Sequence, residues 1–336
     1  MMAGVASEKE NVVIAAGDCA LTILPQLGGK ISSIRLKGRE LLQQPIGPME
    51  PRTRTMAFDE SDASGWDECL PSVAACTMPF ADGEARIPDH GDLWRVEWAR
   101  DCGIPRLGSG QASEPEDRDD AAAKSISLRA RCFSLPLELE RTVSLQERPG
   151  GWRLGLFYTL TNTGTHAAPW SWAAHPLFAV DPGDCINLPN SISSLRLEGS
   201  AARRLGQKGD EVNWPVARLA NGNGEADLRF VPGPNSGVGE KLFAGPMAGD
   251  IGWCELLRPR ARVAIRVSFQ TEKTPYLGLW LCDGGWPDRP GLKQHCLAIE
   301  PATAPVDSLA ETGSWSRTLA PGESCEWTML VDLKTF

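Results

Sequence analysis

The sequence predicts an all-β protein built from antiparallel sheets packed face to face. Apolar and polar residues alternate with period two in segments spread over most of the 336 residues, as strands with one buried face require. Turn residues separate these segments at short intervals, and no segment has the apolar period of a helix of useful length. No internal repeat or linker divides the chain, so we expect one large β-sandwich domain over residues 1–336.

The first third of the chain predicts short strands followed by a long loop. Residues 11–16 and 20–24 predict two strands around a Gly17-Asp18 turn, and residues 31–36 predict a third. Residues 43–66 are rich in Pro, Gly, Ser and Asp and predict a long loop. Residues 103–124 are polar and punctuated by Gly and Pro, which predicts a surface connection.

The clearest alternation comes later in the chain. Further strands are expected at residues 125–132, 133–145, 154–160, 263–269 and 325–333. Two more segments, 169–178 and 294–303, also alternate and carry ionisable side chains. They are the main candidates for chemistry.

Composition and charge exclude several classes of protein. The net charge of −9 argues against a nucleic-acid partner, which requires clustered Lys and Arg. No apolar run approaches the length of a membrane span, and the N-terminal residues lack the regions of a signal peptide. The ten cysteines are scattered and form no Cys-x-x-Cys. We therefore expect a cytoplasmic protein with reduced thiols.

Glu300 is the first candidate for catalysis. In the predicted strand 294–303 it shares a face with Cys296 and Ala298, whose small side chains leave room for a ligand. Pro301 follows it, which favours an extended conformation and removes one backbone donor. The alternative is an ordinary exposed glutamate at the end of a strand.

His175 repeats the same local pattern in residues 169–178. Ser171 and Ala173 share its face, and Pro176 follows it directly. Two strands of this kind predict a surface lined by small residues, into which His175 and Glu300 project. The alternative is a structural histidine.

His90 is a third candidate, because it lies in a turn beside Asp89 and Gly91 and before Trp94. The acid is placed to orient an imidazole, and the glycine permits close approach of a ligand. The alternative is a polar turn, for which Pro-Asp-x-Gly is common. We interpret His166 as a surface residue and His295 as structural.

Two further stretches combine Trp with carboxylates beside turn residues, as a rim that binds a polyol would. They are residues 65–71, with Asp67 and Glu68, and residues 280–287, with Trp280, Asp283 and Trp286. Each is equally interpretable as a loop anchored by a buried Trp. Glycine-rich nucleotide loops, the Gly-x-Ser-x-Gly motif and closely spaced histidine pairs are absent, so we expect no cofactor and no metal. A metal held by His90, His175 and a carboxylate stays open, although no local spacing supports it.

Taken in order, these elements resemble the aldose 1-epimerase (galactose mutarotase-like) family. The resemblance spans nearly the whole chain and rests on residues 27–31, 89–91, 172–178 and 299–301. It implies a β-supersandwich and a cofactor-free interconversion of the α and β anomers of a monosaccharide. It also implies that Glu300 accepts the proton of the C1 hydroxyl, that His175 protonates the ring oxygen, and that His90 binds near that oxygen. His175 would then be protonated and Glu300 ionised when sugar binds.

The remaining binding residues expected are Asp67, Trp94, Trp280, Asp283, Trp286 and an arginine, Arg54 or Arg52. The sugar-phosphate branch of the family has a His-Gly-Phe-Ala-Arg element, and this chain has His90-Gly91-Asp92-Leu93-Trp94-Arg95 instead. Asp67, Glu68 and Asp92 would repel a phosphate, which favours an uncharged or otherwise unusual sugar.

Two other functions remain open from the sequence. One is a sugar-binding or sugar-sensing protein on the same scaffold. The other is a glycoside hydrolase or lyase, in which Glu300 would pair with Asp67 or Asp283. A monomer and a homodimer are both compatible with the sequence.

Overall fold

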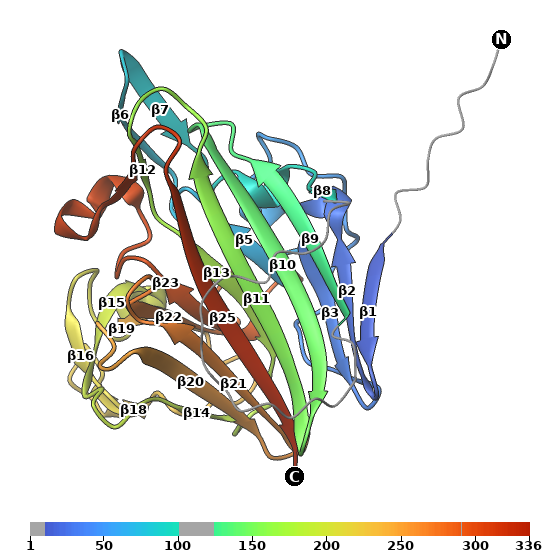
Figure 1. The fold of residues 1–336 in the computed structure, drawn as a ribbon. Coiled ribbons are helices and arrows are strands. Elements are labelled where there is room, and N and C mark those ends of the chain that lie inside the picture. Colours follow the sequence, from blue (N-terminus) through green and yellow to red (C-terminus); the bar gives the residue numbers. More distant parts are fainter. Residues whose placement is uncertain (1–10, 101–123, 290) are drawn as a thin grey trace.

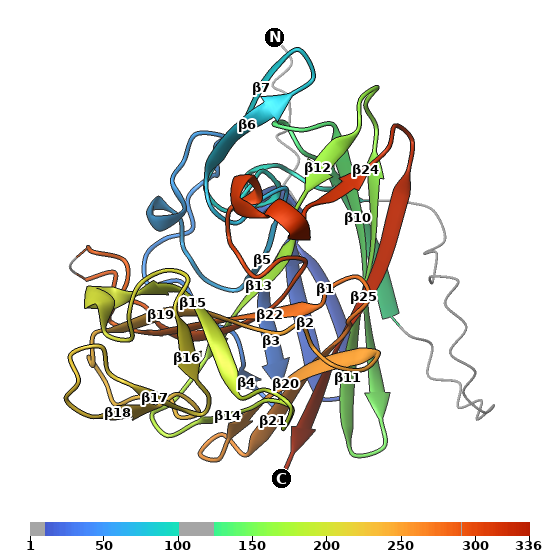
Figure 2. The ribbon, with the colours of Figure 1, turned by 90° about the vertical axis from the view of Figure 1, so that its left-hand side faces the viewer.

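The computed structural model describes residues 11–100, 124–289 and 291–336. It confirms the all-β prediction: two large antiparallel sheets form packed layers, and smaller two-stranded ribbons lie around them (Figures 1 and 2). The described helices are all three-residue 3-10 turns, and none is long and apolar enough to cross a membrane. These turns are η1 (Pro25–Leu27), η2 (Phe58–Glu60), η3 (Leu93–Arg95), η4 (Ala201–Arg203), η5 (Leu309–Glu311) and η6 (Gly313–Trp315).

The larger sheet has eleven strands and gathers segments from both ends of the chain at its centre. In spatial order it contains β1 (Val12–Ala16), β2 (Cys19–Leu24), β3 (Lys30–Leu36), β5 (Trp66–Cys69), β13 (Ala173–Ala179), β23 (His295–Ala302), β22 (Tyr276–Asp283), β19 (Val238–Ala244), β15 (Ser194–Ser200) and β16 (Glu211–Asn213), with β4 (Arg39–Glu40) paired to β3.

The second sheet has eight strands, and its long central strands lie in front of the larger sheet in Figure 1. Its order is β14 (Cys185–Asn187), β20 (Ile251–Arg258), β21 (Val263–Gln270), β25 (Ser324–Thr335), β11 (Gly151–Asn162), β10 (Leu137–Arg148), β9 (Lys124–Arg131) and β8 (Ala99–Arg100). The ribbons are β6 (Cys76–Phe80) with β7 (Gly83–Ile87), β12 (Ala168–Trp170) with β24 (Arg317–Leu319), and β17 (Val216–Arg218) with β18 (Glu225–Asp227).

The main hydrophobic core includes the inner faces of both sheets. On the central strands of the larger sheet, Leu279 and Ile299 belong to this core, whereas their neighbours Ala298 and Ala302 belong to two separate, smaller apolar clusters. Side chains alternate along a strand, so these smaller clusters lie on the outer face of the larger sheet. Glu300 lies between Ala298 and Ala302 in the alternation of β23, so its side chain points to the same outer face.

Most of the predicted strands are confirmed, with two corrections. The alternation at 133–145 becomes a strand only from Leu137, because Asp92 accepts hydrogen bonds from the N–H groups of Phe133 and Ser134 and holds that segment in a turn. Residues 169–178 form two strands, β12 and β13, in different sheets. A surface connection is expected at residues 103–124. Residues 103–123 lie outside the part of the chain that the structure describes, and residue 124 begins β9.

The break between β12 and β13 has a local cause. The N–H of Ser171 donates to the carbonyl of Pro71, and the N–H of Trp172 donates to the hydroxyl of Thr303. Both donors are therefore taken out of a sheet ladder, and the chain changes sheet at this point.

Candidate active site

The central strands of the larger sheet align side chains from distant parts of the chain in one row. β13 pairs with β23 at Ala173–Ala302 and at Leu177–Ala298, and this register sets His175, midway between them, opposite Glu300. On one side of this pair, Asp67 of β5 pairs with His175. On the other side, Gly278 of β22 pairs with Glu300, and Phe243 of β19 pairs with Gly278. Residues of a row across adjacent strands share a face, so the ladder brings the two expected catalytic groups together.

His175 and Glu300 face each other across a short gap. The Nε2 atom of His175 lies 4.0 Å from the Oε1 atom of Glu300, which is too far for a direct hydrogen bond. Glu300 is fully buried, and only 7% of the His175 side chain is exposed. The Oε1 atom of Glu300 and the Nδ1 atom of His175 have no hydrogen-bond partner. A buried carboxylate oxygen without a donor requires an explanation, and a catalytic role is one.

The second oxygen of Glu300 is occupied. Its Oε2 atom forms an ion pair with Nζ of Lys241, which also lies 3.5 Å from Oδ1 of Asp307. Burial alone would lower the pKa of Lys241, but the two carboxylates outweigh it and raise that pKa. Lys241 is therefore a permanent cation beside the candidate base.

His175 is neutral near pH 7 in this structure. Burial lowers its pKa well below the ordinary value for histidine, and electrostatic interactions with His90 and Lys241 lower it further. The mechanism implied by the resemblance needs a protonated His175 when sugar binds. The free protein does not provide that state at neutral pH.

His90 lies beside His175 in an aromatic cluster. The two imidazole rings are 5.0 Å apart and nearly perpendicular. Phe58 of η2 stacks on His90 at 3.7 Å and meets His175 edge-on at 5.3 Å. Trp286 lies behind Phe58, with 6.2 Å between their rings. The long loop predicted at 43–66 thus covers the histidines with an aromatic side chain.

Backbone conformation fixes the position of His90. Both His90 and Gly91 have positive φ, at 58° and 70°. A Cβ atom at position 91 would collide with the backbone of Leu70. Only glycine fits this close approach, which accounts for the residue after the histidine.

Trp280 and Trp286 border the site on its apolar side. Trp280 pairs with Ala298 and so has the parity of Glu300. Both tryptophans are partly buried and pack against a cluster formed by Leu177, Cys282, Cys296 and Ala298. They are placed as an apolar wall next to the row of ionisable groups.

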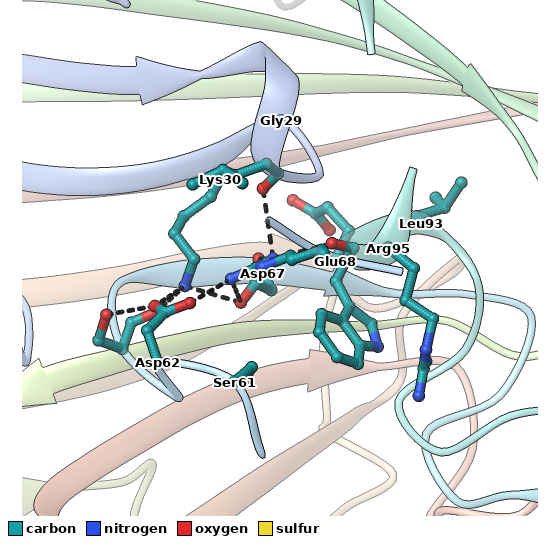
Figure 3. A network of polar contacts seen from close by, with 12 residues as sticks. Gly29, Lys30, Ser61, Asp62, Asp67, Glu68, Leu93 and Arg95 are labelled. Atoms are coloured by element: carbon teal, nitrogen blue, oxygen red, sulfur yellow. Dashed lines mark hydrogen bonds and ion pairs between the residues drawn. The ribbon is translucent and has the colours of Figure 1, made fainter. Parts of the chain in front are cut away.

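Asp67 belongs to the row but is occupied by internal partners. Lys30 lies 2.9 Å from both Asp62 and Asp67 (Figure 3). Arg52 lies 2.8 Å from each of the same two carboxylates. Burial alone would raise the pKa of Asp67, but Arg52 and Lys30 outweigh it and lower that pKa. Arg52 therefore neutralises buried carboxylates, and none of the four side chains is free for a sugar.

The acids expected to repel a phosphate are also committed internally. Glu68 accepts hydrogen bonds from Arg141, Tyr158 and Trp172 between the sheets. Asp92 holds the 133–134 turn through hydrogen bonds of 2.7 to 2.8 Å. With Asp67 neutralised as well, these three acids give no ground for excluding a phosphorylated sugar.

Three predicted binding residues are not brought to the row. Asp283 has the parity of Leu281, on the opposite face from Glu300, and it accepts hydrogen bonds from the N–H groups of Asn235 and Ser236. Its other contact is His295 at 2.6 Å, in keeping with a structural His295.

Trp94 is fully buried, and the guanidinium of Arg95 lies 4.1 Å from its ring. Arg54 is exposed and lies over the ring of Phe133. The structure therefore gives Trp94 a packing role and leaves Arg54 on the surface.

Sequence reasoning missed Lys241, Asp307 and Phe58. Lys241 had a signal, since a lysine inside a strand as apolar as 238–244 needs a buried partner. Asp307 and Phe58 lie outside alternating segments and had none. In the part of the chain that the structure describes, no group of three His, Cys, Asp or Glu side chains could hold a metal ion.

The sequence matches no family profile and no curated protein. The structure, however, is similar to solved structures over nearly its whole length. A candidate aldose 1-epimerase from Escherichia coli K12 has 17% identity and a TM-score of 0.65, covering 97% of this chain and 99% of its own. A galactose mutarotase-like protein from Clostridium acetobutylicum has 16% identity and a TM-score of 0.65, covering 99% and 97%.

A galactose mutarotase related enzyme from Lactobacillus acidophilus has 13% identity and a TM-score of 0.63, covering 97% of this chain and 98% of its own. At these identities the likeness concerns the arrangement of strands rather than the chemistry of the site. The chain has the galactose mutarotase-like fold.

Proposed function

We propose that the protein is an aldose 1-epimerase, which interconverts the α and β anomers of a monosaccharide. The observation that carries the proposal is the pair formed by His175 Nε2 and Glu300 Oε1, which lie 4.0 Å apart with the carboxylate oxygen unpaired. The anomeric carbon of a cyclic aldose bears two oxygens, the C1 hydroxyl and the ring oxygen. A proton acceptor and a proton donor at this separation suit two oxygens held on one carbon. The names of the fold neighbours agree with this chemistry.

In the proposed reaction, Glu300 takes the proton of the C1 hydroxyl while His175 gives a proton to the ring oxygen. The bond between C1 and the ring oxygen breaks, and C1 becomes an aldehyde carbon. Rotation about the C1–C2 bond and reversal of both proton transfers give the other anomer. A positioned acid and base contribute about 10² to 10⁴ in rate, and no hydride, phosphate or metal takes part. His90 lies on the side of the ring oxygen, and Trp280 and Trp286 border the sugar.

The test is an anomer-exchange measurement by NMR exchange spectroscopy on a panel of free and phosphorylated aldoses. Wild-type protein should accelerate exchange of at least one sugar. Glu300→Gln and His175→Asn should each lower kcat by about 10² to 10⁴. His295→Asn is a matched control, because this histidine lies on the other face of the sheet. Exchange at the wild-type rate in either site variant would refute the assigned roles.

A second candidate is a protein that binds sugar without catalysis. The lowered pKa of His175 favours it, because a neutral imidazole is a poor proton donor. The same panel separates the two functions: binding detected by calorimetry with no change in the exchange rate would support the second candidate.

A hydrolytic pair of carboxylates has less support. His175 stands between Asp67 and Glu300 in the row, and Asp67 is held by two cations. Asp283 lies on the opposite face. We also propose a reducing compartment such as the cytoplasm, since the described cysteines are all free thiols.

A further inference from the structure

Lys241 reaches the candidate base from the side opposite His175. It lies on β19, two strands away from Glu300, and the strand between them carries Gly278 at the position beside Glu300. A Cβ atom at position 278 would lie 3.3 Å from Oε2 of Glu300 and 3.2 Å from the ring of Phe243. The missing side chain leaves the space in which the ammonium group and Oε2 meet.

The contact pattern of Glu300 differs from that of Asp67 and Glu68 and is shared by Glu240, which Arg204 holds by Oε1 while Oε2 has no partner. What sets Glu300 apart is that its unpartnered oxygen faces His175, 4.0 Å away. Both oxygens of Asp67 are paired with Arg52, and both oxygens of Glu68 have donors. Glu300 has one oxygen anchored by Lys241, and the other has no partner. Half of this carboxylate is therefore held in place while the other half is open towards His175.

Stability alone is a poor reason to keep such an ion pair. Removing two charges from water costs several kcal/mol per ion, and well-packed apolar residues are often as stabilising as a buried pair. Lys241 is also flanked by Asp307, whose N–H donates to Glu198, so the cation lies between two placed carboxylates. Its side chain is 10% exposed, next to a fully buried Glu300.

We propose that Lys241 is a positioning residue of the epimerase site, which holds Glu300 by Oε2 so that Oε1 meets the C1 hydroxyl, and whose charge sets the pH range of the reaction. The inference rests on the function proposed above. Lys241 acts through Glu300 and His175 and needs no contact with the sugar. A fixed cation disfavours protonation of His175, so its removal should make His175 bind a proton more readily.

The experiment compares pH profiles of kcat/KM for anomer exchange in the wild-type protein, Lys241→Met and Lys241→Arg. Lys241→Met should move the part of the profile that depends on His175 to higher pH by roughly one unit. It should also lower the maximal kcat by about 10²-fold, since misplacement of a catalytic group by about 1 Å costs that much. Lys241→Arg keeps the charge and should retain the position of the profile. Lys241→Gln is the second neutral variant if Lys241→Met does not fold, as judged by circular dichroism.

Arg204→Met provides the matched control. Arg204 pairs at 2.8 Å with buried Glu240, the residue next to Lys241 on β19 but on the other face of the sheet. This variant also strips a cation from a buried carboxylate, yet its pH profile should match the wild type. A purely structural Lys241 would behave in the same way as Arg204, with lower stability and an unmoved profile.

The outcomes are separable. The inference is supported if the wild-type protein is active, the pH profile is shifted in the neutral variants, and Lys241→Arg has the wild-type profile. An active wild-type protein whose neutral variants keep the wild-type profile overturns the inference and leaves the proposed function intact. A wild-type protein that accelerates exchange of no sugar in the panel overturns the proposed function, and the inference with it.

Discussion

Gly278 provides a direct way to disturb the candidate base without touching its charge. In Gly278→Ala the new Cβ atom would lie 3.2 Å from Cβ of Glu300, 3.2 Å from Cε1 of Phe243 and 3.3 Å from Oε2 of Glu300. Carbon atoms in ordinary van der Waals contact are about 3.5 to 4.0 Å apart. The neighbours must therefore move by a few tenths of an ångström, and the carboxylate is one of them.

The size of the effect follows from that displacement. A misplacement of about 1 Å costs about 10²-fold in rate, so a shift of a few tenths should lower kcat by roughly 3- to 10-fold. The tighter packing should also lower the free energy of unfolding by about 1 to 3 kcal/mol. NMR exchange spectroscopy measures the first quantity, and urea denaturation measures the second.

The control is Gly199→Ala on β15 of the same sheet. A Cβ atom at position 199 would meet only Cβ of Lys241, at an ordinary 3.9 Å. This variant should keep the wild-type rate. A folded Gly278→Ala protein with an unchanged kcat would show that the position of Glu300 does not limit the reaction, and the geometric argument for the site would fail.

Two further predictions concern pH. If protonated His175 is the acid, kcat/KM should fall as pH rises above the lowered pKa of that residue. It should therefore be at least about 10-fold higher at pH 5.5 than at pH 7.5, and a flat profile over this range in stopped-flow polarimetry would contradict the role. For stability, Lys30 and Arg52 outweigh the effect of burial and lower the pKa values of Asp62 and Asp67, so these acids contribute stability above about pH 4 that is lost as pH falls. Lys30→Met should cost about 3 to 5 kcal/mol at pH 7 in urea denaturation and less as pH drops below 4, whereas a pH-independent cost would contradict this account.

The strands were predictable because each buries one face. Period-two alternation in residues 125–132 and 263–269 exists because every second side chain enters the core, and a turn ends each run. The same logic misjudged residues 169–178. There Ser171 and Trp172 donate their N–H groups to partners from distant segments, and alternation carries no information about such partners.

The alternation of side chains along single strands also predicted which residues share a face with Glu300 and with His175 in the candidate site. It placed Glu300 with Ala298 and His175 with Ala173, and the register of β13 and β23 brings these faces together. It could not reveal that the pairing of β22 with β23 turns Asp283 to the face opposite Glu300. Nor could it reveal that Asp67 forms ion pairs with Lys30 and Arg52. Those facts depend on pairing between segments far apart in the sequence, which local patterns do not encode.

Burial is the main cause of the lowered pKa of His175, and the position of Lys241 adds to it. An imidazole next to a free buried carboxylate would gain a strong ion pair by accepting a proton, and its pKa would rise. Here Lys241 has already paired with Glu300, so a proton on His175 would gain little attraction and would meet two other positive groups, with burial as the dominant cost. The resting positive charge beside Glu300 is thus on Lys241. An acid role for His175 therefore depends on the sugar: a C1 hydroxyl between Nε2 and Oε1 and a ring oxygen at the imidazole would supply the polar partners that the 4.0 Å gap lacks.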